Sequence, residues 1–419
     1  MARQSQGAQL GRRRALEGAL CGLACAALPG CRSTGEAPAG VRVAPPQPPA
    51  EREPLVAAPT EPAEPADDAA LRAMIGQLLI VGFRGRRAPG DAPIARDLAE
   101  RNLGGVLLFD RDDILGDHKR NIESPTQLRA LTDDLRAAAT TAPIIAIDQE
   151  GGYVNRLLPR YGFRRAESAW RLGQGPTSRT RAVAGTIADA LANAGITMNF
   201  APVVDLRTNP KSPIIAKVER SFSRDPEVVT RHARAFIAAH HDRGLACAIK
   251  HFPGHGSARA DSHLGFVDIT ETWRREELDP FRALIAAGDC DAVMTGHLFH
   301  AALDPEVPAT LSKPVITDLL RGELGHAGVV ISDDMHMGAI VDNYSLDDAL
   351  RRALAAGVDL LILGNNARYS PDTAAQAIDV IAEHVAQGRL PRATIEAAHA
   401  RVTALKERLA APPAERSQG

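Results

Sequence analysis

The sequence has few cysteines, and their positions exclude two kinds of small-protein architecture. The chain of 419 residues contains five, at positions 21, 25, 31, 247 and 290, so that three of them lie within the first 31 residues. The two cysteines of the remaining chain do not have the spacing of metal ligands. Neither a disulfide framework nor a zinc ribbon is therefore indicated.

The sequence also lacks an excess of either charge. It has 49 Lys and Arg against 51 Asp and Glu, so no overall electric field steers it toward nucleic acid. No segment reaches the roughly 18 apolar residues that a membrane-spanning helix requires, and no Gly-x-Gly-x-x-Gly follows the first predicted strand, which weakens a dinucleotide-binding interpretation. A hydrophobic content of 45% supports a large core. These bounds favour a soluble globular enzyme, with a monomer as the default.

The N-terminal residues are typical of a targeting segment rather than of a folded domain. In residues 1–31, three arginines at 12–14 precede a short apolar run that ends at Cys31, as in a bacterial export signal closed by a lipoprotein cleavage site. Residues 32–68 are rich in Pro, Ala and Glu and are predicted to be a disordered linker. We therefore expect an exported protein held at the cell envelope by a lipid on Cys31. A disordered basic tail on a cytoplasmic protein is the alternative.

From residue 69 to residue 411 the pattern becomes regular, and 412–419 is a predicted disordered tail. Short apolar runs alternate with longer amphipathic stretches such as 227–244 and 347–357, which indicates an α/β protein with a parallel sheet covered on both faces. Eight such units predict a single (β/α)8 barrel of the TIM type, with an open doubly wound sheet as the alternative. The eight runs are 77–83, 104–109, 143–148, 196–202, 247–252, 291–297, 328–333 and 358–364.

Polar residues follow these apolar runs, where a barrel places its active site. Because the carboxyl ends of the strands meet at one face of the barrel, we expect these side chains to converge. A single such residue could instead cap the following helix. The residues are Asp110, Asp148, Glu150, Asp205, Lys250, His251, His297, Asp333 and Asp334.

The stretch KHFPGHGSARADSH, from Lys250 to His263, is the densest cluster of titratable residues. A metal site is disfavoured because the Pro-Gly pair after Phe252 prevents a helix that presents two histidines on one face, and because the ammonium of Lys250 would repel a cation. We therefore expect no metal and no cofactor. Asp261 lies two residues before His263, so its carboxylate can hold one ring nitrogen while the other transfers a proton to or from a substrate.

Five separated motifs resemble a known family. They are IDQEGGYVNRL at 147–157, NFAPVVDL at 199–206, ERSFSRDP at 219–226, KHFPGHG with DSH at 250–263, and LLRGELGHAGVVISDDM at 319–335. Together they resemble glycoside hydrolase family 3, in the branch of single-domain β-N-acetylglucosaminidases, over roughly 70–410. The resemblance implies a retaining, exo-acting enzyme that removes terminal N-acetylglucosamine from peptidoglycan fragments or related oligosaccharides.

The resemblance also assigns roles to individual residues. Asp333, which directly follows Ser332, matches the nucleophile of the family signature, whereas the adjacent Asp334 does not. In this branch a loop histidine paired with an aspartate two residues earlier acts as the acid and base, and these residues are His263 and Asp261 here. Asp148, Arg156, Arg220, Lys250 and His251 match positions that bind sugar hydroxyls and the N-acetyl group, while His255 and Glu150 are left as residues that hold the loops.

Three positions depart from the pattern of this branch. Tyr153 stands where Arg is common, Asp112 where Asn is usual, and Val267 where Pro often follows the loop. Because of these departures, the sequence does not determine which leaving group or which amino sugar is preferred. The remaining alternatives are a β-glucosidase of the same family, a sugar-binding envelope protein without catalysis, and phosphorolysis in place of hydrolysis, since a histidine does not repel phosphate as a carboxylate does.

Overall fold

A computed structural model of the chain describes residues 65–263 and 265–410. The expected leader, most of the expected linker and the C-terminal tail lie outside these residues. The first described helix, α2 (Pro65–Gln77), begins four residues before residue 69, where the sequence predicts the barrel domain to begin. It packs Leu71 and Ile75 into the core.

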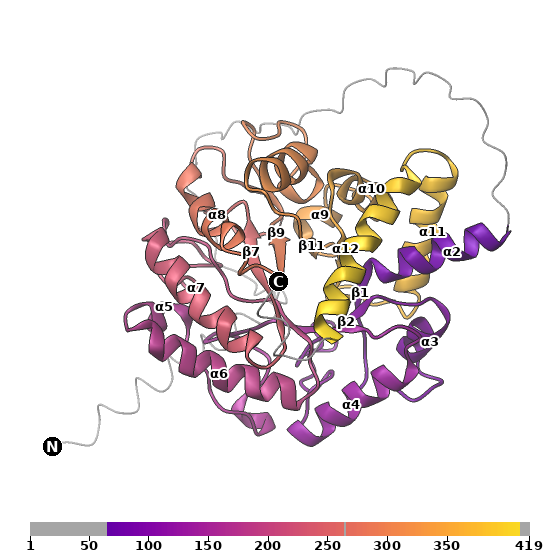
Figure 1. Ribbon diagram of the computed structural model, residues 1–419, viewed down its shortest axis with the longest axis horizontal. Helices are drawn as coiled ribbons and strands as arrows, with labels where there is room; N and C mark the ends of the chain where they lie inside the picture. The colour runs from indigo at the N-terminus through magenta and orange to yellow at the C-terminus, as the bar shows by residue number, and fades with distance from the viewer. Residues whose placement is uncertain (1–64, 264, 411–419) are drawn as a thin grey trace, which may run out of the picture. The chain divides into compact units, whose positions relative to one another are not determined.

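Eight parallel strands close into a barrel, as the sequence predicts (Figure 1). Neighbouring strands around the ring follow the order β1-β12-β11-β9-β7-β6-β3-β2. Nearly all strand residues are buried, because side chains fill the interior and helices cover the outside. The strands are β1 (Leu79–Gly82), β2 (Gly105–Leu108), β3 (Ile144–Ile147), β6 (Met198–Asn199), β7 (Ala246–Phe252), β9 (Ala292–Thr295), β11 (Val329–Asp334) and β12 (Leu360–Leu363).

Helices surround the barrel, and several begin with a side-chain cap. Ser124, Asp225 and Ser345 each accept a hydrogen bond from a backbone N–H of the first turn that follows. The α-helices after α2 are α3 (Pro93–Glu100), α4 (Pro125–Ala138), α5 (Ala169–Gly173), α6 (Thr177–Asn193), α7 (Pro226–His241), α8 (Asp279–Ala286), α9 (Gly338–Val341), α10 (Leu346–Ala356), α11 (Thr373–Ala386) and α12 (Arg392–Ala410).

The connections contain further short elements that the sequence pattern did not predict. A hairpin of β4 (Gln149–Gly151) and β5 (Val154–Asn155) follows β3, and β8 (Val267–Asp268) pairs with β10 (Leu298–Phe299) in a small parallel sheet. The 3-10 turns are η1 (Pro159–Tyr161), η2 (Arg275–Leu278) and η3 (Ala309–Leu311), and η4 (Pro314–Glu323) is wound as a π-helix. Most of these elements lie in connections that leave the carboxyl ends of the strands.

One glycine explains how the two ends of the barrel sequence come together. A Cβ atom on Gly82, at the end of β1, would lie 1.9 Å from the carbonyl oxygen of Gly364, just after β12. Only glycine allows the backbones to approach this closely. The first and the last strand of the barrel therefore meet through two residues without side chains.

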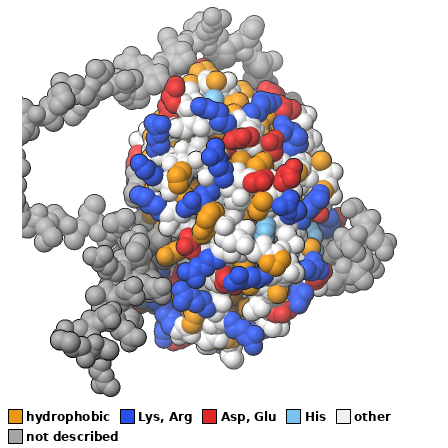
Figure 2. All heavy atoms as spheres, turned by 90° about the vertical axis from the view of Figure 1, so that its left-hand side faces the viewer, with side chains coloured by type: hydrophobic (Ala, Val, Ile, Leu, Met, Phe, Trp, Pro, Cys, Tyr) orange, Lys and Arg blue, Asp and Glu red, His pale blue; other side chains and the backbone are white. Residues whose placement is uncertain are grey.

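The outer surface is mixed in charge on the side shown in Figure 2. Lys and Arg side chains are interspersed with Asp and Glu, and hydrophobic atoms form only small separate patches on this face. Within the described part of the chain, no helix combines the length and the apolar character needed to cross a bilayer.

Candidate active site

The predicted polar residues lie at the carboxyl ends of the barrel strands. Asp333 and Asp334 are the last two residues of β11, Lys250 and His251 lie near the end of β7, and Asp148 directly follows β3. None of these residues is the N-cap of a described helix for which a cap is defined: the helices that follow their strands begin after Ser168, Leu278 and Met337, among others. Helix capping therefore does not explain these polar residues.

Asp333 has the environment of a carboxylate that stays ionised. Its Oδ1 accepts a hydrogen bond of 2.8 Å from the backbone N–H of Asp334. Burial would raise the pKa of this carboxyl, but the field of three neighbouring imidazoles and of that N–H lowers it to about 2. The imidazoles belong to His297, His251 and His263. An ionised carboxylate is what a nucleophilic role requires.

The adjacent Asp334 is engaged in holding the backbone. Its Oδ1 accepts hydrogen bonds from the N–H groups of Gly364, at 2.8 Å, and His336, at 3.0 Å. Its carbonyl oxygen accepts a hydrogen bond of 3.0 Å from Nε2 of His297, whose Nδ1 lies 2.8 Å from the hydroxyl of Thr310. Asp334 thus ties the ends of β11 and β12 together, and its backbone fixes the ring of His297.

The pair Asp261 and His263 forms as the sequence predicts. The Oδ1 of Asp261 lies 2.8 Å from Nδ1 of His263 and also accepts the backbone N–H of His263 at 2.9 Å. Partial desolvation at the site lowers the pKa of His263, but the hydrogen bond and the charge of Asp261 raise it by more, with a further contribution from Asp333. The side chain of His263 is 56% exposed, so its free nitrogen is accessible from outside the barrel.

The loop that carries this pair is attached next to the strand of Asp333. The carbonyl of Ser262 accepts a hydrogen bond of 3.3 Å from the N–H of Ala339, and that of His263 one of 3.4 Å from the N–H of Gly338. Both donors lie in α9, which begins four residues after β11 ends. The charges of Asp333 and His263 stabilise each other, as expected for two groups of one site.

A buried chain of charged groups links the expected sugar-binding residues. Lys250 Nζ lies 2.6 Å from Asp148 Oδ1 and 2.8 Å from Glu150 Oε1. The guanidinium of Arg220 donates to both oxygens of Glu150, from Nε at 2.8 Å and from Nη2 at 2.7 Å. Arg220 Nη2 also lies 3.1 Å from Nε2 of His251. Four residues named from the sequence are therefore joined through Glu150.

The contacts among these buried groups determine the protonation states of Lys250 and His251. Burial would lower the pKa of Lys250, but Asp148 and Glu150 raise it, so the ammonium persists at neutral pH. Burial lowers the pKa of His251 well below its usual value, and Arg220 lowers it further. Because a guanidinium can only donate, Nε2 of His251 is the acceptor. The Nδ1–H of His251 then donates to Asp205 Oδ2, 2.7 Å away.

Arg156 lies on the neighbouring connection. Its backbone N–H donates to Oε1 of Gln149 at 2.9 Å, and its Nη1 lies 3.7 Å from Oδ1 of Asp110, which is buried after β2. The guanidinium carbon lies 5.6 Å from the centre of the Phe109 ring. The β4–β5 hairpin therefore places Arg156 at the carboxyl ends of β2 and β3.

Three residues that sequence reasoning placed on the rim, but not in the site, take central positions. Glu150 joins Lys250 to Arg220, Asp205 holds His251, and His297 lies beside Asp333. Their position at or shortly after the end of a predicted apolar run was the available signal. The sequence could not show that their partners are the residues named for catalysis and binding.

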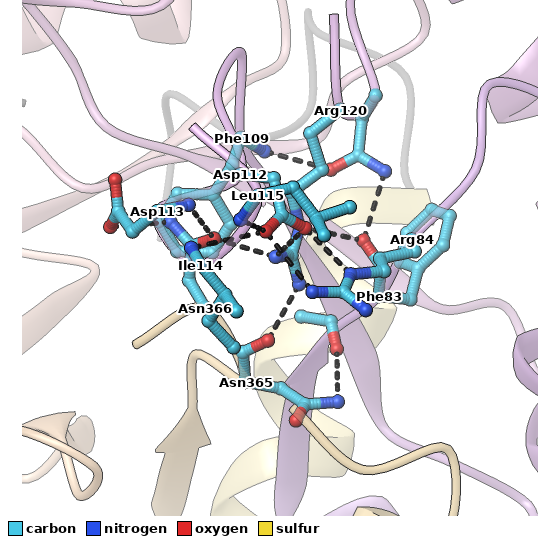
Figure 3. A network of polar contacts seen from close by, with 12 residues as sticks. Phe83, Arg84, Phe109, Asp112, Asp113, Ile114, Leu115, Arg120, Asn365 and Asn366 are labelled. Carbon is cyan, nitrogen blue, oxygen red and sulfur yellow. Dashed lines mark hydrogen bonds and ion pairs between the residues drawn. The ribbon is translucent and has the colours of Figure 1, made fainter. Parts of the chain in front are cut away.

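Asp112, one of the departures from the family pattern, belongs to a separate network between β1, β2 and β12 (Figure 3). Its carboxylate accepts hydrogen bonds from Arg84, at 2.7 and 3.1 Å, and from Arg120, at 2.9 Å. Arg120 also donates to Oδ1 of Asn366 at 2.6 Å. The charge of Asp112 balances the two arginines, which a neutral Asn could not do.

The exposed large hydrophobic residues of the described chain all lie on loops of this face. Ile114 and Leu115 are 50% and 65% exposed and follow Asp112, whose carboxylate accepts their backbone N–H groups. Tyr153 is at the turn of the β4–β5 hairpin, and Phe266 follows the loop of His263. The outer part of the site therefore offers apolar surface, in contrast to its charged floor.

No group of three or more His, Cys, Asp or Glu side chains in residues 65–263 and 265–410 is arranged to hold a metal ion. In the stretch from Lys250 to His263, His255 is buried with Nε2 3.3 Å from the hydroxyl of Ser262, and its backbone N–H donates to Asp205. His255 thus holds the base of the loop.

Sequence comparison finds relatives that share most of the barrel. A protein named beta-hexosaminidase from Alkalilimnicola ehrlichii is 37% identical over 304 residues, which are 70% of this chain and 82% of that protein. Beta-hexosaminidase A of Pseudoalteromonas piscicida is 32% identical over 375 residues, and the match covers 80% of this chain. This chain spans only 61% of the length of the latter protein.

Structural comparison gives matching results. A glycoside hydrolase family 3 beta-N-acetylglucosaminidase from Paenibacillus sp. superposes with a TM-score of 0.74 and 35% identity, covering 81% of this chain and 62% of that one. A beta-N-acetylhexosaminidase from Beutenbergia cavernae gives a TM-score of 0.72 and 30% identity, covering 80% of this chain and 98% of that one. The model of the glycosyl hydrolase family 3 N terminal domain matches residues 70–405. The chain therefore belongs to glycosyl hydrolase family 3.

Proposed function

We propose that the protein is a retaining, exo-acting β-N-acetylglucosaminidase. The observation that carries this proposal is the position of the Asp261–His263 pair, whose loop is hydrogen-bonded to the helix that follows β11, the strand of the ionised Asp333. A carboxylate nucleophile and a separate proton carrier are the two groups that a retaining glycosidase needs. The names and structures of the relatives support the same activity.

In the first step, an oxygen of Asp333 attacks the anomeric carbon of the terminal sugar. The bond between that carbon and the leaving-group oxygen breaks, and the imidazolium of His263 gives its Nε2 proton to this oxygen. Asp261 keeps the Nδ1–H oriented and stabilises the imidazolium before transfer. The products of this step are the free leaving group and a glycosyl ester of Asp333.

In the second step, the neutral Nε2 of His263 accepts a proton from a water molecule. The water oxygen attacks the anomeric carbon, and the bond to Asp333 breaks, which restores both the carboxylate and the imidazolium. Two displacements at one carbon return the β configuration. Phosphate could replace water as the acceptor, because the exposed His263 does not repel an anion.

The charged floor of the site would hold the terminal sugar. Lys250, Arg220 and Arg156 provide donors and Asp148 provides acceptor oxygens for hydroxyl groups, while His251 holds Arg220 in place through Nε2. Since the cations are already paired and oriented, they need not be reorganised when the sugar binds. This fixed arrangement fits the recognition of a polar, uncharged ring.

We further propose that the substrates are peptidoglycan fragments or related oligosaccharides and that the protein is a monomer. Cys31 would carry a lipid that holds it at the cell envelope, as the export-type pattern of residues 1–31 indicates. Mass spectrometry of the protein from its native membrane tests the anchor: an intact Met1 without lipid would contradict it. Sedimentation analysis tests the monomer.

The activity is tested with 4-nitrophenyl β-N-acetylglucosaminide beside the matching β-glucoside. We expect hydrolysis of the N-acetyl substrate, with the β-anomer as the first product in NMR spectra. Asp333→Asn should reduce kcat by about 10⁴-fold. Asp334→Asn is the matched control, because an amide oxygen can still accept the N–H groups of Gly364 and His336. Equal losses in the two variants, or preference for the glucoside, would contradict the proposal.

A further inference from the structure

The segment between β7 and the loop of His263 passes between two buried carboxyl groups. Residues 253–257 connect the end of β7 to the tip at 261–263 and form the stem of the loop. Asp205, after β6, lies on one side of the stem, and Glu277, in η2, lies on the other. Both side chains belong to residues with no exposed surface.

On the Asp205 side of the stem, both carboxylate oxygens accept hydrogen bonds. Oδ1 of Asp205 accepts the backbone N–H groups of His251, at 3.2 Å, and of His255, at 2.7 Å, and Oδ2 accepts Nδ1–H of His251. On this side a Cβ atom on Gly256 would lie 1.6 Å from the carbonyl oxygen of Leu206. The stem is therefore pressed against the backbone that follows β6.

The Glu277 side is equally close, and the groups that donate toward its carboxyl are the N–H of Gly256 and the hydroxyl and N–H of Ser257. Oε2 of Glu277 accepts the backbone N–H of Gly256 at 3.1 Å. A Cβ atom on Gly254 would lie 2.7 Å from Cβ of Glu277. The carboxyl also faces Ser257, while Oε1 has no hydrogen-bond partner of normal geometry among the described residues.

No described cation forms an ion pair with Glu277, and the charge of another carboxylate, Asp205, raises its pKa. Its neighbours Arg274, Arg275 and Glu276 are exposed, and Arg275 pairs with Glu323. On the facing side, His255 and Arg220 act on Asp205. A buried carboxylate without a cation is unfavourable, whereas a carboxylic acid in the same place can both accept from an N–H and donate from its O–H.

We propose that Glu277 acts as a neutral carboxylic acid that positions the loop of Asp261 and His263, and that loss of its proton releases the stem of this loop. Oε2 would accept the Gly256 N–H while the Oε1–H donates toward the hydroxyl of Ser257. After ionisation, two carboxylates would face each other across a stem of small residues. Burial, supported by the charge of Asp205, raises the pKa of Glu277 to about 8. The positioning role rests on the proposed function of His263, whereas the protonation state does not.

Trp273 provides a direct report of the stem. Its indole N–H donates to the carbonyl of Pro253 at 3.0 Å, and the sequence has only one other tryptophan, Trp170. In a Trp170→Phe background, the fluorescence of Trp273 should change between pH 7 and 9 with a midpoint near 8. His300, whose ring centre lies 5.0 Å from that of Trp273, has a pKa lowered by burial and titrates below this range.

Two further variants show whether ionisation of Glu277 causes this fluorescence change. Adding Glu277→Gln, which keeps the shape and cannot ionise, should abolish the fluorescence change, whereas adding His263→Ala should leave it in place. Absence of the transition in the folded Trp170→Phe protein would overturn the proposal, as would its persistence in the Glu277→Gln protein. Circular dichroism establishes that each variant is folded.

The activity tests the positioning role separately. At pH values above the pKa of both groups, the slope of log kcat/KM against pH should approach −2 in the native protein, because His263 and Glu277 each lose one proton. In the Glu277→Gln variant the slope should approach −1, because only His263 still loses a proton. Its activity at pH 6.5 should stay within about threefold of the native value. The same slope in both proteins, or a large loss at pH 6.5, would overturn the positioning role. If no glycosidase activity is found at all, the proposed function fails while the fluorescence result still decides the state of Glu277.

Discussion

Glu150→Gln should destabilise the protein strongly, although it changes only one atom. The carboxylate of Glu150 is buried and accepts three hydrogen bonds of 2.7–2.8 Å, two from Arg220 and one from Lys250. The amide retains one acceptor oxygen and places an NH₂ group against a cation. Two buried cations then share one fewer negative charge.

The size of the loss follows from the burial of the pair. Removing one partner of a buried ion pair typically costs about 3–5 kcal/mol. Lys250 keeps Asp148 at 2.6 Å, and the amide still accepts one hydrogen bond, so we expect the lower end of the range, about 3 kcal/mol. At an unfolding entropy of about 2 cal/mol/K per residue, such a loss corresponds to a decrease of about 4 °C in the Tm of the barrel domain.

Glu167→Gln is the matched control for this prediction. Glu167 also forms a two-point contact with an arginine, with distances of 2.5 and 3.1 Å to Arg179, but the two side chains are 33% and 50% exposed. Exposed pairs contribute only about 0–1 kcal/mol. The two variants therefore differ in burial and not in the chemistry of the substitution.

Urea unfolding followed by circular dichroism measures both free energies of unfolding. The midpoint for Glu150→Gln should fall clearly below that of Glu167→Gln, with similar slopes. If the two variants lose the same free energy, or if Glu150→Gln loses less than about 1 kcal/mol, the reasoning that burial makes this charge indispensable would be refuted.

Two further substitutions test the loop of His263. Asp261→Asn removes the charge that raises the pKa of His263; because the imidazolium donates the proton in the first step, the alkaline limb of kcat/KM should move to lower pH, and a shift to higher pH would contradict this role. Gly254→Ala places a Cβ 2.7 Å from Glu277 at a φ of +125° and should lower the free energy of unfolding by about 1–3 kcal/mol. Gly388→Ala, at a φ of +70° with no atom within 4 Å, is the control in thermal unfolding and should lose less.

The barrel could be predicted because its strands are buried on both faces and are therefore continuous apolar runs. All eight predicted runs overlap a strand of the barrel, although β7 begins one residue before its run and β11 ends one residue after its run. The lengths were less predictable: the run at 196–202 yields only Met198–Asn199 as strand, after which Val203 makes a single bridge to Lys250. The small pairs β4–β5 and β8–β10 depend on contacts between loops, which apolar periodicity does not report.

The candidate site was predictable where chemistry depends on short spacing. Asp261 and His263 are two residues apart, and their hydrogen bond forms locally. In contrast, Glu150 meets Arg220 across 70 residues and Glu277 meets Gly256 across 21. No spacing in the sequence reports such pairings, so the residues that hold the site were not identified as a connected set.

The two halves of the site differ in how they are attached to the barrel. The floor is built from charged groups at buried strand ends, joined by contacts of 2.6–2.8 Å. The tip with His263 is exposed and is tied to α9 by two longer hydrogen bonds, of 3.3 and 3.4 Å. In the proposed mechanism, recognition of the sugar therefore depends on the scaffold, whereas proton transfer depends on a loop that is more weakly attached. Changes in the length or sequence of this loop can therefore alter which leaving groups are accepted, while the charged groups at the strand ends stay unchanged.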